Sequence, residues 1–132
     1  MKSLFLSFVG ATSLFAAVSA ESHHSFAAEF DVNRPVKLTG TVTKLEWTNP
    51  HAWVFIDAKD DSGKVQSWAV ELVGINDLLR RGWGRDRVKQ GDTINVDGFG
   101  AKNGTNTANA ASVTLANTGE LLWASVPRTE GN

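Results

Sequence analysis

Three runs of β-forming residues, separated by short turns, dominate the stretch between residues 36 and 72. The runs cover residues 36–47, 52–59 and 64–72, and they are rich in Val, Thr, Ile, Phe and Trp, whose branched or aromatic side chains favour strands. The turn between the second and third runs reads Asp-Asp-Ser-Gly, a composition typical of a hairpin loop. The pattern predicts an antiparallel meander of three strands.

The first run changes phase along its length. Its apolar residues alternate as far as Val42 and then resume out of phase at Leu45. Such a shift indicates a bulge or bend, which we place near Lys44. Gly40 lies just before it, where a strongly curved strand leaves little room for a side chain.

The remainder of the fold is predicted from one helical segment and three further strand-like segments. A short helix is expected over residues 75–81, ended by Gly82, and strands over residues 93–101, 108–116 and 121–124. A long first strand, a meander, a helix and then closing strands is the element order of an OB-like fold. We therefore predict an all-β domain with one short helix, a small OB-like β-barrel of five to six strands.

The first 20 residues have the features of a secretory signal peptide. They contain a positive charge at Lys2, an apolar run from Leu4 to Val18 and a small-residue exit ending at Ala20. The apolar run is shorter than the ~20 residues that a membrane-spanning helix needs. We predict export to the periplasm, with no membrane span after signal removal.

The rest of the chain is expected to form a single domain. The predicted division is an N-terminal arm over residues 21–34, the barrel over residues 35–126 and a flexible tail over residues 127–132. The absence of cysteine excludes disulfides, thiolate metal clusters and cysteine nucleophiles. The formal net charge of −1 offers no electrostatic reason to bind polyanions, so we predict no nucleic-acid partner.

Two adjacent histidines, His23 and His24, follow the predicted cleavage site. Cleavage after Ala20 would leave a free α-amine two residues before His23, and the amine, two backbone nitrogens and the imidazole would suit Cu(II) or Ni(II). Cleavage after Ser22 would instead make His23 the terminus, with its amine and ring both available. The sequence leaves both alternatives open, and each indicates a Cu(II)-type site.

His51 is the third histidine and lies in the Asn49-Pro50-His51 turn, at a predicted strand end. Loops at strand ends carry many functional sites, although His51 can equally serve only to shape the turn. If the arm folds back over this loop, three imidazoles could meet in a metal site. Carboxylates available as ligands or as partners of the imidazoles are Glu29, Asp31, Glu46 and Glu71.

A different kind of site is suggested by Arg80, Arg81, Trp83 and Arg85. Guanidinium groups beside an exposed indole can hold a carboxylate, a phosphate or a stacked ring. This alternative predicts a metal-independent interaction domain that binds a periplasmic protein or a small anionic ligand. The competing interpretation is a helix C-terminus with favourable cations and a solvated loop.

No nucleophile or general base is evident, so we assign no catalytic residue and favour a binding protein over an enzyme.

Three motifs carry a family resemblance: His23-His24-Ser25-Phe26, Trp47-Thr48-Asn49-Pro50-His51-Ala52-Trp53 and Leu79-Arg80-Arg81-Gly82-Trp83. With them the chain resembles a family of small exported proteobacterial proteins of unknown function, over nearly the whole mature domain. The resemblance implies a periplasmic OB-like β-barrel that begins with paired histidines and carries an Asn-Pro-His turn. It implies no particular reaction.

Overall fold

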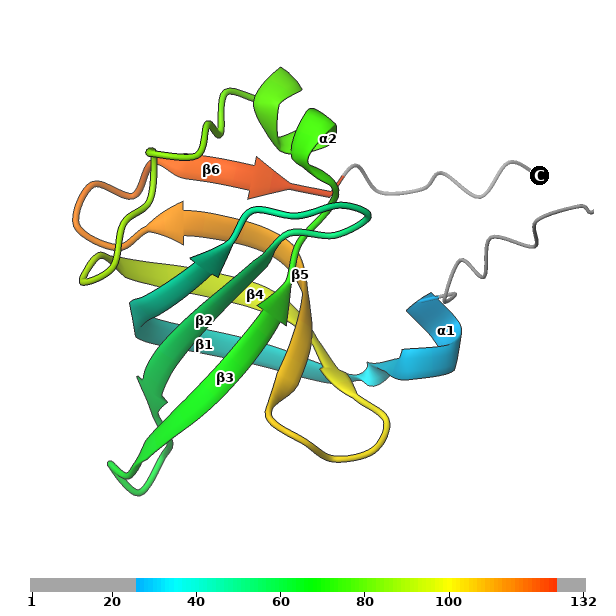
Figure 1. Ribbon diagram of the computed structural model, residues 1–132. Helices are drawn as coiled ribbons and strands as arrows, with labels where there is room; N and C mark the ends of the chain where they lie inside the picture. Colours follow the sequence, from blue (N-terminus) through cyan, green and yellow to red (C-terminus); the bar gives the residue numbers. More distant parts are fainter. Residues whose placement is uncertain (1–25, 126–132) are drawn as a thin grey trace, which may run out of the picture.

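The computed structural model describes residues 26–125, which form one sheet and two short helices (Figure 1). In chain order the elements are α1 (Phe26–Glu29), β1 (Phe30–Glu46), β2 (Trp53–Lys59), β3 (Val65–Glu71), α2 (Ile75–Arg80), β4 (Thr93–Ala101), β5 (Thr107–Leu115) and β6 (Leu121–Ala124).

The sheet has the strand order β3-β2-β1-β4-β5-β6, and β3 also pairs with β5. That last pairing is parallel and joins Ala69–Glu71 to Thr107–Asn109, whereas the other neighbours are antiparallel. Five strands therefore pair in a closed ring, with β6 added beside β5. The helix α2 comes between β3 and β4 in chain order and lies at the end of the ring near β6 (Figure 1). This confirms the predicted all-β, OB-like fold with six strands.

The long strand β1 pairs with β2 on one side and with β4 on the other. Its register to β2 shifts between Val42 and Lys44, which confirms the predicted bulge. A Cβ on Gly40 would lie 2.8 Å from the backbone oxygen of Asp57 in β2, so the close approach of the two strands here requires glycine. The bulge and the glycine together let one strand bend around the ring.

β1 begins earlier than the sequence suggested. Sequence analysis placed Phe30 and Arg34 in an extended arm, but both belong to β1, and a single helical turn precedes them. Phe30 is buried and is paired with Ala101, whose carbonyl oxygen accepts a 2.6 Å hydrogen bond from Arg34 Nη1. These contacts to β4 extend the strand toward its N-terminal end.

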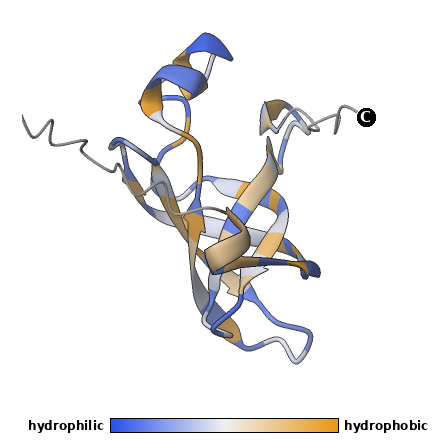
Figure 2. Ribbon diagram, turned by 90° about the vertical axis from the view of Figure 1, so that its right-hand side faces the viewer, coloured by the Kyte–Doolittle hydropathy of each residue, from blue (hydrophilic) through white to orange (hydrophobic). Residues whose placement is uncertain are grey.

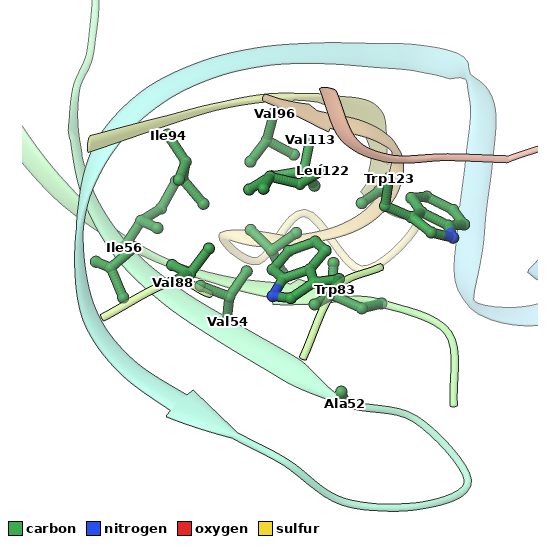
Figure 3. Packing of buried hydrophobic residues seen from close by; sticks show 14 of the residues in the cluster. Ala52, Val54, Ile56, Trp83, Val88, Ile94, Val96, Val113, Leu122 and Trp123 are labelled. Atoms are coloured by element: carbon green, nitrogen blue, oxygen red, sulfur yellow. The ribbon is translucent and has the colours of Figure 1, made fainter. Parts of the chain in front are cut away.

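The core lies inside the ring of strands (Figure 3). Alternate residues of β2 and β4 point inward, and hydrophilic and hydrophobic residues alternate in colour along several strands in Figure 2. The largest fully buried side chains are Trp83, Ile56, Leu72, Leu78 and Ile94. Within residues 26–125, neither helix has the length and apolar content that a membrane span requires.

The end of α2 explains how Trp83 reaches this core. Gly82 has a positive φ of 84°, and its N–H donates to Leu79 O at 3.0 Å, while the N–H of Trp83 donates to Leu78 O at 2.9 Å. This pair of bonds is a Schellman motif, in which the residue after the glycine makes an apolar contact back to the last helical turn. Trp83 and Leu78 accordingly both belong to the buried cluster.

The β2–β3 hairpin is closed by the carboxylate of Asp60. Its Oδ1 accepts hydrogen bonds from Ser62 Oγ at 2.6 Å, Ser62 N at 2.9 Å and Lys64 N at 3.0 Å. These bonds, first among them the one from the Ser62 hydroxyl, favour the ionised form and lower the pKa of Asp60 below its ordinary value.

Ser62→Ala is expected to raise the pKa of Asp60, because the hydroxyl that stabilises its carboxylate is removed. Carboxyl chemical shifts followed by NMR during an acid titration would measure the change, with the wild-type titration of Asp60 as the reference. An Asp60 titration midpoint that stays the same in the variant would contradict this account of the turn.

Candidate metal-binding site

The Asn-Pro-His turn joins β1 to β2 and is tied to the start of α2. Asn49 Oδ1 accepts a 3.0 Å hydrogen bond from the backbone N–H of Ile75, the first residue of α2. Inside the turn, Thr48 Oγ1 donates to His51 O at 2.9 Å. These bonds hold the turn against the segment that follows β3.

The ring of His51 is hydrogen-bonded to one acceptor and lies near a second. Its Nδ1 lies 3.0 Å from Leu72 O and 3.5 Å from Glu71 Oε1. A backbone carbonyl can only accept, so Nδ1 carries the hydrogen in that bond, and in the neutral imidazole Nε2 keeps its lone pair. The side chain remains 44% exposed, and this orientation is typical of a histidine that binds a metal through Nε2.

Glu71 lies on the outer side of β3, yet only 11% of its side chain is exposed. It stands opposite Trp53 of β2 and Asn109 of β5, and Asn109 Nδ2 donates to Glu71 Oε1 at 3.3 Å. A buried carboxylate requires such partners, because burial without them would be costly. Glu71 therefore belongs to a local polar cluster beside His51.

The N-terminal segment enters the fold near Trp53, the first residue of β2 after the turn. The ring of Phe26 stacks on Phe30 and meets Phe99 edge-on, both with centroids 5.7 Å apart. A cavity of about 300 Å³ lies between this segment and Trp53, which follows His51 by two residues. Figure 2 shows α1 in front of the strands on this side of the molecule. Residues lining the cavity include Ala28, Glu29, Phe30, Trp53, Asn103 and Thr105.

The predicted metal ligands are only partly described by the structure. His23 and His24 lie outside the described residues, and His51 lies within them. Among residues 26–125, no three His, Asp or Glu side chains gather closely enough to share a metal ion.

The carboxylates named as possible metal ligands or imidazole partners differ in their surroundings. Asp31 accepts a hydrogen bond from the N–H of Asn33 at 2.9 Å, and Glu46 pairs with Lys44 at 2.6 Å. Glu71 is the one that contacts His51. Sequence reasoning included Glu71 among four candidates but missed Asn109, because their contact depends on the parallel pairing of β3 with β5.

The alternative site was predicted around an exposed Trp83, and the structure contradicts that exposure. Trp83 was expected to be exposed, but it is fully buried, so its ring offers no surface to a ligand. The physical reason is the Schellman motif, which turns the residue after Gly82 back toward the core. The prediction of an exposed indole is wrong.

The arginines of the alternative site point to different partners. Arg80 Nη1 bonds to Asp77 Oδ1 of its own helix at 2.6 Å. Arg81 donates to the carbonyl oxygen of Ala124 in β6, with its guanidinium 6.0 Å from the ring centroid of Trp123. Arg85 is exposed. Two of the three guanidinium groups thus have partners within the protein, Arg80 on α2 itself and Arg81 on β6.

Solved structures with a similar arrangement of strands include single-stranded DNA-binding proteins. Mitochondrial Rim1 from S. cerevisiae is 10% identical, with a TM-score of 0.48, over 62% of this chain and 92% of Rim1. The N-terminal domain of PriB from Thermoanaerobacter tencongensis is 16% identical, with a TM-score of 0.44, over 63% of this chain and 96% of that domain.

These neighbours contradict the prediction that nucleic acid is not a partner. Rim1 is a single-stranded DNA-binding protein. The prediction was based on the near-neutral net charge, and a net charge does not describe how charges are distributed over a surface. The exclusion of nucleic acid is therefore withdrawn.

Sequence comparison identifies a family but no characterised relative. No curated protein matches the chain. One family model matches residues 12–110, which include the His-His segment, the Asn-Pro-His turn and most of the strands. The chain belongs to the family of unknown function DUF6152.

Proposed function

We propose that this chain is a periplasmic binding domain that holds Cu(II) or a similar divalent ion, with its N-terminal histidines and His51 as ligands. The observation that carries the proposal is the orientation of His51. Its Nδ1 is engaged by Leu72 O, and its ring is almost half exposed. An imidazole held in this way offers Nε2 to a metal.

The position of the N-terminal segment supports a shared site. His24 and His23 precede Phe26 by two and three residues, which gives them a reach of about 10 Å from it in an extended chain. Phe26 is anchored on Phe30 and Phe99, and the chain then passes Trp53, two residues from His51. Phe26, where the described chain begins, and the turn before Trp53 therefore belong to one side of the domain.

The ligand chemistry favours copper. An α-amine, backbone nitrogens and an imidazole form the planar nitrogen set that suits Cu(II), and signal removal would create the amine. His51 would add an imidazole from the folded domain. Ni(II) and Zn(II) can use some of the same ligands, so competition among the three metals belongs in the test.

Native mass spectrometry of the exported protein, before and after one equivalent of Cu(II), would test the proposal. We expect one copper to remain bound against a competing chelator, and the intact mass to identify the new N-terminus. His23→Ala should abolish retention, and His51→Ala should weaken it by about tenfold or more. Gln90→Ala, at an exposed position before β4, is the matched control.

Two results would overturn parts of this proposal. Wild-type protein that retains no copper would eliminate the metal-binding function. Full retention in His51→Ala, with loss in His23→Ala, would remove His51 from the ligand set and confine the site to the arm.

A further inference from the structure

We propose that Glu71 is a positioning residue that reinforces the hydrogen bond of His51 to Leu72 O and so favours one ring nitrogen as the metal ligand. Together with Leu72 O, it would hold the hydrogen on Nδ1 and leave Nε2 as the ligand atom. This inference rests on the proposed function, and it adds a residue of the folded domain to the site.

The geometry around Nδ1 favours one tautomer. Leu72 O lies 3.0 Å from Nδ1, and Glu71 Oε1 lies 3.5 Å from it. A carbonyl and an ionised carboxylate are both acceptors without a hydrogen to donate. If Nδ1 carried the lone pair, it would face two oxygens, so the neutral ring is stabilised with its hydrogen at Nδ1.

Glu71 is held in place for this role. Its side chain is nearly buried, and Asn109 Nδ2 donates to Oε1, the same oxygen that faces His51. Glu71 also sits in register between Trp53 and Asn109, so two strands flank its backbone. An acceptor that is fixed in this way can orient an imidazole ring, whereas an acceptor on a mobile side chain cannot.

The same geometry separates the positioning residue from the ligand. Nδ1 is occupied by Leu72 O, so a metal would approach the ring at Nε2, away from Glu71. Glu71 acts through His51 and does not need to touch the ion. Carboxylate and carbonyl partners of metal-binding histidines have this function in other proteins, where losing them typically lowers metal affinity 10- to 100-fold.

The test compares Glu71→Leu and Glu71→Gln with Glu120→Leu as the matched control, since exposed Glu120 pairs with Arg87 rather than His51. Long-range proton–nitrogen NMR of the metal-free exported protein would report the His51 tautomer. We expect hydrogen at Nδ1 in the wild type, a mixture of tautomers in Glu71→Leu and an intermediate result in Glu71→Gln, whose amide oxygen can still accept.

Cu(II) affinity is measured on the same samples. Glu71→Leu should weaken binding about tenfold or more, Glu71→Gln by less, and Glu120→Leu should leave it unchanged. If Glu71→Leu fails to fold, Glu71→Gln still tests the proposal through its tautomer ratio and its affinity.

The possible failures are distinguishable. A wild-type ring with its hydrogen at Nε2, or Glu71 variants with an unchanged tautomer and unchanged affinity, would overturn the role of Glu71 while copper binding stands. Wild-type protein that binds no Cu(II) would overturn the proposed function itself, whatever the tautomer.

Discussion

Trp83→Ala is expected to lower the free energy of unfolding by about 3–5 kcal/mol, the range for removing a large aromatic side chain from a core. Trp83 is fully buried and is the largest such side chain in the domain. It enters the core from the loop after α2, where Figure 3 shows it in the same cluster as Val54 and Val88. Its removal would leave a cavity between that loop and the strands.

The loss would be a large fraction of the total stability, since domains of this kind unfold with about 5–15 kcal/mol. Urea unfolding followed by circular dichroism would measure it without depending on tryptophan fluorescence. A decrease of less than about 1 kcal/mol would contradict the packing described for Trp83.

Trp83→Phe is the informative control. Within the described residues, Trp83 Nε1 is buried and has no hydrogen-bond partner. An unsatisfied buried donor costs about 1–3 kcal/mol, and phenylalanine removes that cost while it keeps an aromatic ring. We therefore expect Phe to restore most of the stability lost in the Ala variant. Equal losses in both variants would indicate that the indole nitrogen has a partner.

The burial of Trp83 also shows where sequence reasoning was incomplete. The end of α2 was predicted at Gly82, and the structure has the glycine there with its positive φ. The charged neighbours of Trp83 suggested exposure, but the residue after a Schellman glycine commonly makes an apolar contact with the helix. The backbone motif, and not the charge of the flanking residues, determined where the indole lies.

The strands were predictable because their signals are local. Alternating apolar residues and turn-forming residues predicted the ranges of β2 to β6 closely, and the change of phase in β1 indicated the bulge. The start of β1 was not predictable in this way. Phe30 joins the sheet through Ala101, a residue far along the chain, and only the folded β4 provides that partner.

The candidate site likewise contains one residue that local sequence indicated, His51, and one whose role depends on the folded sheet, Glu71. His51 and its turn were recognised from residues that are adjacent in sequence. The importance of Glu71 depends on Asn109, which reaches it only after β3 and β5 pair in parallel. An outward position on a strand normally implies an exposed carboxylate. The sequence alone could therefore not distinguish Glu71 from the other three candidate carboxylates.

Gly98→Ala is the second change for which we expect a large effect. Gly98 lies on β4 at the point where the register to β5 shifts, directly after Asp97. A Cβ there would lie 2.1 Å from the backbone oxygen of Asn109 and 3.2 Å from the Cα of Ala110. No rotation of a side chain can relieve a clash with backbone atoms, so the two strands would have to separate.

We expect Gly98→Ala to cost at least the upper part of the ~1–3 kcal/mol range for overpacked substitutions. Gly100→Ala is the matched control two residues along β4, because its new Cβ would meet the flexible Arg34 side chain at 3.0 Å and that chain can move. Urea midpoints of the two variants would compare them directly. Similar midpoints would mean that β4 and β5 are not as close at Gly98 as the structure has them.

Since Asn109 also bonds to Glu71, Gly98→Ala should in addition disturb the polar cluster beside His51. Gly100→Ala should leave that cluster intact.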